Sequence, residues 1–134
     1  MEKSLHLKLF YTESKKSQIE IQDIFNNLEQ SKGESYFYHV LFLKLHLLHA
    51  QALALNFGAI ESMAKVLSDI FFQVKLGNLD LNDASFNATK EGINILGELI
   101  EALNTGEKIK YLFCKTQMGE ILKEDAKLGK SQTL

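Results

Sequence analysis

Two histidines one helical turn apart are the residues of this chain whose type and spacing best suit chemistry. His46 and His49 lie within residues 41–50, which are otherwise apolar apart from Lys44. An imidazole titrates near neutral pH, and its unprotonated ring nitrogen acts as a nucleophile, a proton acceptor or a metal ligand. We interpret His46 as a candidate phosphoryl acceptor. The alternative is a histidine without a chemical role, which lies at the boundary between core and solvent and bonds to water or to a carbonyl group.

The neighbours of His46 suit a surface that a protein partner visits. Residues three and four apart share a helix face, so one strip is expected to contain Phe42, His46, His49, Ala50 and Leu53. His49 can donate a hydrogen bond to phosphoryl oxygens, and the small Ala50 lets a partner's backbone approach the ring. Phe42 and Leu53 add apolar binding area. The strip is therefore expected to combine a reactive histidine with a docking surface.

A helix from about residue 35 to residue 55 is expected to carry both histidines. Apolar residues form one continuous stripe along it, made of Leu41, Leu45, Leu48, Ala52 and Leu55. His46 is rotated by about 100° from Leu45 around such a helix, so it lies at the edge of the stripe. The pattern therefore predicts that the His46 ring lies at the boundary with water.

Four further segments show the same periodicity. Helices are expected at about residues 17–30, 59–76, 83–103 and 107–123. Because the chain contains no proline, glycine and polar residues must end them. Gly77 is expected to close the third helix in the left-handed conformation, and Asn82 to cap the start of the fourth. Gly92 and Gly97 lie within the fourth helix, where they are expected to permit close contact with other helices.

Residues 1–13 leave two structures open. Leu5, Leu7, Leu9 and Tyr11 alternate with a period of two, so a short strand or hairpin competes with an extension of the first helix. We divide the chain into an N-terminal extension at residues 1–13, a helical bundle at 14–125 and a flexible tail at 126–134. The predicted fold class is all-α, an up-down four-helix bundle with an additional C-terminal helix.

Composition and charge exclude several classes of protein. The 134 residues suit one domain, and the formal net charge of -2 lacks the positive surface of a nucleic-acid binder. One cysteine forms no internal disulfide, and no apolar run reaches the roughly 18 residues that span a bilayer. We expect a cytoplasmic protein without membrane insertion. The chain has no phosphate-binding glycine loop and no nucleophile elbow, so neither independent ATP binding nor a cofactor is expected.

Residues 41–50 read Leu-Phe-Leu-Lys-Leu-His-Leu-Leu-His-Ala, and they are followed by Asn56-Phe57-Gly58 and by a helix expected to end at Gly77. This run resembles the amino-terminal histidine phosphotransfer domain of CheA-type chemotaxis kinases, where it is typically Leu-Phe-x-x-x-His-Ser/Thr-Ile/Leu-Lys-Gly. In that family a small-residue stretch, Phe-Gly and a further helix that ends in Gly come next. A looser likeness extends from about residue 17 to residue 122.

The resemblance implies a role for each residue of the strip. His46 falls on the phospho-accepting histidine, His49 on a lysine that contacts phosphate, and Ala50 on a glycine that admits the partner. Ser68 takes the place of a glutamate that fixes the tautomer of the histidine, and Asp69 lies beside it. Serine can accept the same hydrogen bond without adding negative charge, whereas Asp69 would replace the glutamate only if the helix were rotated.

The same resemblance implies a phosphocarrier domain rather than a free-standing enzyme, and it leaves open whether the domain is part of a histidine kinase. The domain would accept a phosphoryl group from a histidine kinase catalytic domain and pass it to an aspartate of a response-regulator receiver domain. The three replacements at His49, Ala50 and Ser68 leave a second possibility open, an interaction module that binds a signalling partner without phosphotransfer. A third reading, a metal site at His39, His46 and His49, is disfavoured because no Glu-x-x-His motif occurs.

Overall fold

The helical periodicity of the sequence produces five helices in the part of the chain that the structure describes. The computed structural model describes residues 2–28 and 35–132, with side chains for 5–28 and 35–123. Its helices are α1 (Glu2–Leu28), α2 (Ser35–Ala54), α3 (Gly58–Lys75), α4 (Asp83–Thr105) and α5 (Leu112–Gln132). No strand occurs in the described ranges, and the predicted all-α class is confirmed.

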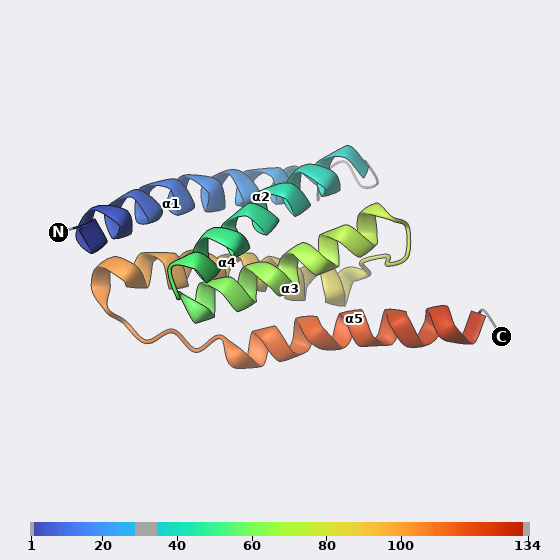
Figure 1. Ribbon diagram of the computed structural model, residues 1–134. Helices are drawn as coiled ribbons and strands as arrows, with labels where there is room; N and C mark the ends of the chain where they lie inside the picture. The colour runs from blue at the N-terminus through green and yellow to red at the C-terminus, as the bar shows by residue number, and fades with distance from the viewer. Residues whose placement is uncertain (1, 29–34, 133–134) are drawn as a thin grey trace.

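Four of the helices form an up-down bundle, and α5 covers one side of it. α1 packs against α2 and α4, and α3 packs against the same two helices. α5 packs against α3 and α4, and Figure 1 shows it running below α3. Among the described residues, α2 contacts α1 and α3 but neither α4 nor α5. One side of α2 is therefore left uncovered by the rest of the bundle.

The buried stripe of α2 is the one that its periodicity predicts. Leu41, Leu45, Leu48 and Ala52 are buried, and Leu55 is partly buried just beyond the end of the helix. They belong to a core whose fully buried side chains from the other helices include Ile21, Phe25, Met63, Leu67, Ile70, Ile93 and Leu96. Burying one leucine stabilises a fold by roughly 1.5–3 kcal/mol. The stripe therefore determines which way α2 faces, and with it the outward direction of His46.

Polar and glycine residues end the helices where the sequence predicts. The Asn82 side chain accepts a hydrogen bond from the backbone N–H of Ser85 at 2.8 Å and so caps α4. Gly77 has a φ of 80° and Gly106 a φ of 75°, the left-handed conformation that glycine adopts without strain. Asn56 has a φ of 63° in the turn between α2 and α3, a conformation that asparagine tolerates better than most residues.

Two glycines let α4 approach its neighbours closely, as predicted. A Cβ atom at Gly92 would lie 2.5 Å from Sδ of Met118 in α5. A Cβ atom at Gly97 would lie 2.6 Å from Nε2 of Gln18 in α1. Both distances are well below the contact distance of unbonded atoms. The absence of a side chain at these two positions therefore sets how closely α4 packs against α5 and α1.

The strand or hairpin considered for residues 1–13 does not form in the described part of the chain, because α1 begins at Glu2. Burial follows helical spacing rather than alternation: the buried side chains are Phe10, Ser14, Gln18 and Ile21, whereas Leu5, Leu7 and Leu9 are exposed. The Tyr11 hydroxyl also donates a hydrogen bond to the Glu101 carboxylate of α4 at 2.6 Å. The expected end of this helix at residue 30 lies outside the described residues.

α5 differs from the expected fifth helix at both ends. It begins at Leu112 rather than near Glu107, and residues 106–111 form a non-helical connection. Ile109 and Tyr111 of this connection pack against the core, which holds it in place. α5 continues to Gln132, so residues 126–132, expected in a flexible tail, are helical. Residues 133–134 lie outside the described ranges.

Candidate functional site

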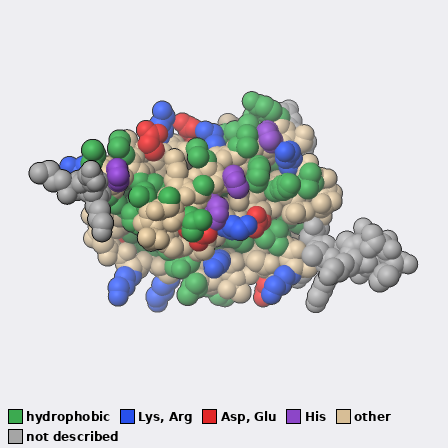
Figure 2. Space-filling view, viewed as in Figure 1, with side chains coloured by type: hydrophobic (Ala, Val, Ile, Leu, Met, Phe, Trp, Pro, Cys, Tyr) green, Lys and Arg blue, Asp and Glu red, His purple; other side chains and the backbone are tan. Residues whose placement is uncertain are grey.

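His46 is exposed on the uncovered side of α2, where the sequence places it. Its ring stacks on that of Phe42, with centroids 5.5 Å apart and planes at 29°. Phe42 is only partly exposed, because its ring also packs against Phe72 of α3 at 5.1 Å. An aromatic pair that spans α2 and α3 therefore supports the His46 imidazole without burying it. Figure 2 shows histidine side chains next to each other on the face formed by these two helices.

His49 lies beside His46, but its ring is held by α3. The two ring centroids are 6.3 Å apart, and the His49 side chain is only 16% exposed. Its Nδ1 atom lies 3.1 Å from Oε1 of Glu61 and 3.2 Å from the backbone oxygen of the same residue. Glu61 lies in the first turn of α3. The structure therefore brings together His46 and His49, as the sequence predicts, and adds a carboxylate that the sequence reading did not include.

Ser68 and Asp69 do not hydrogen-bond to His46. The Ser68 hydroxyl is buried and donates to the backbone oxygen of Lys65 at 2.8 Å, one turn earlier in α3. This is the usual alternative for a serine within a helix, whose short side chain reaches its own backbone. Asp69 forms an ion pair with Lys65 at 3.2 Å, at the favourable i,i+4 spacing. Among the described residues, no hydrogen bond reaches either ring nitrogen of His46.

The expected docking residues lie on the outer side of α2. Ala50 is exposed, and Leu53 is 58% exposed. Leu43 and Leu47, which the sequence reading did not single out, are 50% and 57% exposed. A signal for them was present, because α2 has more apolar residues than one buried stripe can contain. The uncovered side of α2 therefore carries three exposed leucines around the histidines, which is typical of a surface that binds another protein. We call Leu43, Leu47, Ala50 and Leu53 the α2 docking face.

One lysine lies near the aromatic pair that supports His46. The Nζ atom of Lys75 is 5.9 Å from the ring centroid of Phe42 and 6.0 Å from that of Phe72. A cation at this distance from an aromatic ring interacts favourably with it. Lys44, on α2 itself, instead forms an ion pair with Glu20 of α1. Lys75 therefore adds positive charge on the side of the site where α3 ends, a feature that the sequence reading missed.

The described residues do not form a metal site of the kind considered for His39, His46 and His49. No group of three or more His, Cys, Asp or Glu side chains there is arranged to hold a metal ion. His39, the third histidine of that reading, has its Nδ1 atom buried without a hydrogen-bond partner. None of the helices, over the residues searched, is both long enough and apolar enough to cross a membrane.

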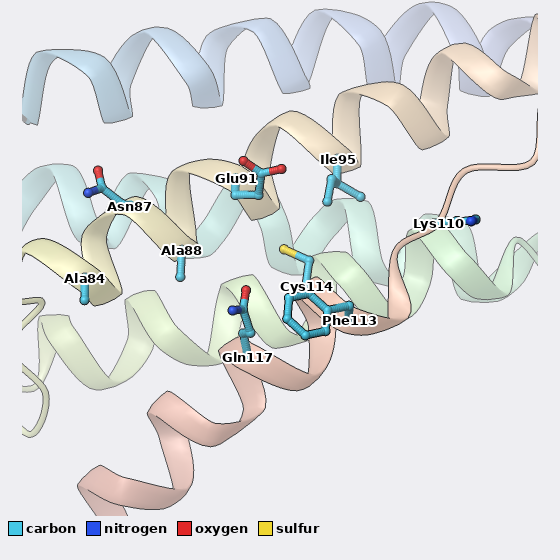
Figure 3. A pocket seen from close by; sticks show the side chains of 9 residues that line it. All are labelled: Ala84, Asn87, Ala88, Glu91, Ile95, Lys110, Phe113, Cys114 and Gln117. Carbon is cyan, nitrogen blue, oxygen red and sulfur yellow. The ribbon is translucent and has the colours of Figure 1, made fainter.

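A recess of about 510 Å³ lies between α4 and α5, away from the histidines. It is lined by Ala84, Asn87, Ala88, Glu91, Ile95, Lys110, Phe113, Cys114 and Gln117. Figure 3 shows Phe113 and Cys114, at the start of α5, facing Glu91 and Ile95 of α4. Burial, and to a lesser degree the charge of Glu91, raises the pKa of the Cys114 thiol, so the thiol stays protonated and weakly nucleophilic near neutral pH. None of the residues that line it belongs to α2 or α3, so this recess does not belong to the histidine site.

Comparison with solved structures finds the same fold in a phosphotransfer domain. The phosphorylated P1 domain of CheA3 in complex with CheY6, from R. sphaeroides, superimposes with a TM-score of 0.73. The two sequences are 13% identical, and the match covers 91% of this chain and 96% of that one. No protein-family model and no curated protein sequence matches the chain. The likeness shows that this chain has the fold of a histidine phosphotransfer domain, so the resemblance seen in the sequence is confirmed at the level of the fold.

Proposed function

We propose that this protein carries phosphoryl groups in a two-component signalling pathway, with His46 as the acceptor. A histidine kinase catalytic domain supplies the phosphoryl group, and an aspartate of a response-regulator receiver domain receives it. The observation that carries the proposal is the exposed His46 ring on the uncovered side of α2, in a bundle with the fold of a phosphotransfer domain. Such a role belongs to the cytoplasm, where the kinase finds its ATP.

The chemistry requires one unprotonated ring nitrogen on His46. That nitrogen attacks the γ-phosphorus of ATP held by the kinase, so an N–P bond forms as the P–O bond to ADP breaks. In the second step a carboxylate oxygen of the receiver attacks the same phosphorus, and the N–P bond breaks. The electron pair returns to the imidazole, and the product is an acyl phosphate on the receiver. The ring must therefore be open to two proteins in turn, which agrees with its exposure.

The residues around His46 have supporting roles in this proposal. His49, 6.3 Å away between ring centroids, donates to the phosphoryl oxygens in place of a lysine. Phe42 holds the ring of His46 against the helix by stacking. Lys75 adds positive charge beyond Phe42, which favours the approach of an anionic group. Ser68 and Asp69 bond to other groups of α3 and make no hydrogen bond to the ring, so we assign them no direct role.

The α2 docking face is the surface that we assign to the receiver domain. Its leucines are exposed, and Ala50 leaves space beside the imidazole for a partner's backbone. A partner that covers these leucines gains apolar burial, and at the same time brings its aspartate to the reactive nitrogen. The solved neighbour is in complex with CheY6, which supports a receiver domain as the partner.

The test is transfer of radiolabelled phosphate from ATP through a histidine kinase. We expect a label on this protein that is lost in acid, stable in base, and absent from the His46→Gln variant. The His49→Gln variant should still take the label, although more slowly, because it keeps the nucleophile. Labelling that is unchanged by His46→Gln would refute the assignment.

A second candidate function is binding of a receiver domain without phosphotransfer. The observation that favours it is that no described side chain hydrogen-bonds to a ring nitrogen of His46, so nothing there selects the nucleophilic tautomer. This alternative predicts that a receiver domain binds, that no label is transferred, and that His46→Gln leaves the dissociation constant unchanged. Label transfer to the receiver, measured beside calorimetric titration of both forms with the same receiver, separates the two functions: binding without any transfer supports the alternative.

A further inference from the structure

The hydrogen bonds of His49 determine which of its ring nitrogens carries hydrogen. Its Nδ1 atom lies 3.1 Å from the carboxylate and 3.2 Å from the backbone oxygen of Glu61. Both oxygens are acceptors, so Nδ1 must be the donor. The ring orientation is thereby held by α3, and the opposite nitrogen, Nε2, is left for other contacts. Of the described residues, the titratable groups in contact with this ring are Glu61 and His46.

Whether Nε2 carries hydrogen determines whether His49 can stabilise a phosphoryl group. In the neutral ring with hydrogen on Nδ1, Nε2 presents a lone pair, which repels phosphoryl oxygens. When the ring carries a second proton, Nε2–H becomes a charged donor, the kind of group that binds such oxygens well. If the ring is protonated, the Glu61 carboxylate, whose Oε1 atom lies 3.1 Å from Nδ1, balances its positive charge, and neither side chain is more than 24% exposed. Partial burial reduces screening by solvent, so this interaction is stronger than that of an exposed pair.

We propose that Glu61 is a positioning residue for His49, and that the two together supply the cation that steadies the phosphoryl group on His46. This inference rests on the proposed function and deepens it. Glu61 does not touch the phosphoryl group; it holds the ring in one orientation and balances its charge. A histidine backed by a carboxylate thereby does the work that a lysine would do alone.

The first test compares the effect of Glu61→Gln in two backgrounds. Glutamine keeps an acceptor for Nδ1 but removes the charge, so Glu61→Gln should lower the rate of phosphoryl transfer into His46 by about tenfold. In the His49→Lys background the cation is permanent, so Glu61→Gln should change the rate by less than about twofold. An ion pair that serves only to join α2 to α3 would give the same loss in both backgrounds. That outcome would overturn the proposal.

The matched control is Glu20→Gln. Glu20 forms an ion pair with Lys44, so the variant removes one carboxylate charge from another ion pair between α2 and a neighbouring helix. We expect its transfer rate to equal that of the wild type. A loss as large as that of Glu61→Gln would show that any weakening of the contacts of α2 slows transfer, and would overturn a specific role for Glu61.

A second measurement examines the His49 ring without any transfer reaction. Long-range ¹H–¹⁵N NMR spectra of the wild-type protein distinguish the two ring nitrogens, and we expect hydrogen on Nδ1 at every pH at which the protein is folded. A neutral ring with hydrogen on Nε2 would overturn the proposal. Wild-type protein that takes no label at His46 would refute the proposed function and this inference together, whereas normal labelling of Glu61→Gln would refute this inference alone.

Discussion

The ring of Phe42 stacks on the ring of His46, with centroids 5.5 Å apart. The same ring also packs against the ring of Phe72 in α3. Phe42 therefore couples the position of the His46 imidazole to Phe72 of α3. A Phe42→Leu substitution keeps an apolar side chain but removes the aromatic face. We expect it to slow transfer from His46 to a receiver by about threefold to tenfold, since aromatic pairs contribute roughly 0.5–1.5 kcal/mol beyond the area that they bury.

Phe72→Leu is the matched control for this prediction. Phe72 contacts Phe42 but is not in ring contact with His46. The variant should lose a similar free energy of unfolding, measured by urea denaturation, while it keeps most of the transfer rate. Equal slowing by both variants would indicate that Phe42 acts through the general stability of the α2–α3 pair.

The α2 docking face gives a prediction about affinity. Leu47 and Leu53 are more than half exposed, so replacing either by aspartate should leave the fold intact while it places a charge on the surface assigned to the receiver. We expect Leu47→Asp to weaken receiver binding by about tenfold or more, measured by calorimetric titration. Leu112→Asp, at a similarly exposed leucine of α5, should bind as the wild type does. Equal affinities for all three proteins would place the receiver elsewhere.

The fold was accessible from the sequence because burial in a bundle repeats with the helical period. Leu41, Leu45 and Leu48 are buried as predicted, and Asn82 caps α4 as predicted. The N-terminal segment was ambiguous because period-two alternation of its leucines competed with helical spacing. Contacts between residues that are far apart in the sequence, such as the hydrogen bond from Tyr11 to Glu101, cannot be predicted from a local pattern.

The exposure of His46 could also be predicted from the sequence, because it follows from the buried stripe on the same helix. The partners of the histidines were harder to predict, since they depend on how α2 and α3 slide and rotate against each other. By the family resemblance Ser68 was expected in the place of a glutamate that bonds to the histidine, but its hydroxyl donates to the backbone oxygen of Lys65 instead. Glu61 was not recognised, although the short turn between α2 and α3 places the start of α3 opposite the end of α2. That register is the signal that could have identified it.

Gly92 and Gly119 give opposite predictions for the same substitution. A Cβ atom at Gly92 would meet Met118 at 2.5 Å and Leu67 at 3.3 Å, and both side chains are fully buried, so the end of the Met118 side chain must shift within the packed core to admit it. We expect Gly92→Ala to lower the free energy of unfolding by about 1–2 kcal/mol, because overpacking outweighs the gain in helix propensity. A Cβ atom at Gly119 in α5 would have no neighbour within 4 Å.

Gly119→Ala should therefore stabilise the protein, by up to about 1 kcal/mol, the difference in helix propensity between the two residues. Both free energies are measured by urea denaturation followed by circular dichroism. Stabilisation by both substitutions would contradict the close packing of α4 against α5 at Gly92.

The Tyr11–Glu101 hydrogen bond between α1 and α4 gives a prediction about acid. The pKa of the Glu101 carboxyl is held below its usual value, chiefly by the hydrogen bond from the Tyr11 hydroxyl and then by the one from Lys15. A carboxyl whose pKa is lowered in the folded state stabilises the fold above the ordinary glutamate pKa of about 4.3. This contribution is lost as the pH falls through the folded-state pKa. Tyr11→Phe should therefore lower stability at pH 7, and its effect should shrink between about pH 5 and pH 3.

The measurement is urea unfolding of the wild type and Tyr11→Phe at several pH values across that range. The control is the same pair in a Glu101→Gln background, where the carboxyl no longer titrates and the effect of Tyr11→Phe should not vary with pH. Lys15 also approaches the Tyr11 hydroxyl, at 3.1 Å, so part of the loss at pH 7 will remain in that background. An effect of Tyr11→Phe that stays constant from pH 7 to pH 3 in the wild-type background would mean that the tyrosine joins α1 to α4 by packing alone, with no contribution from the charge of Glu101.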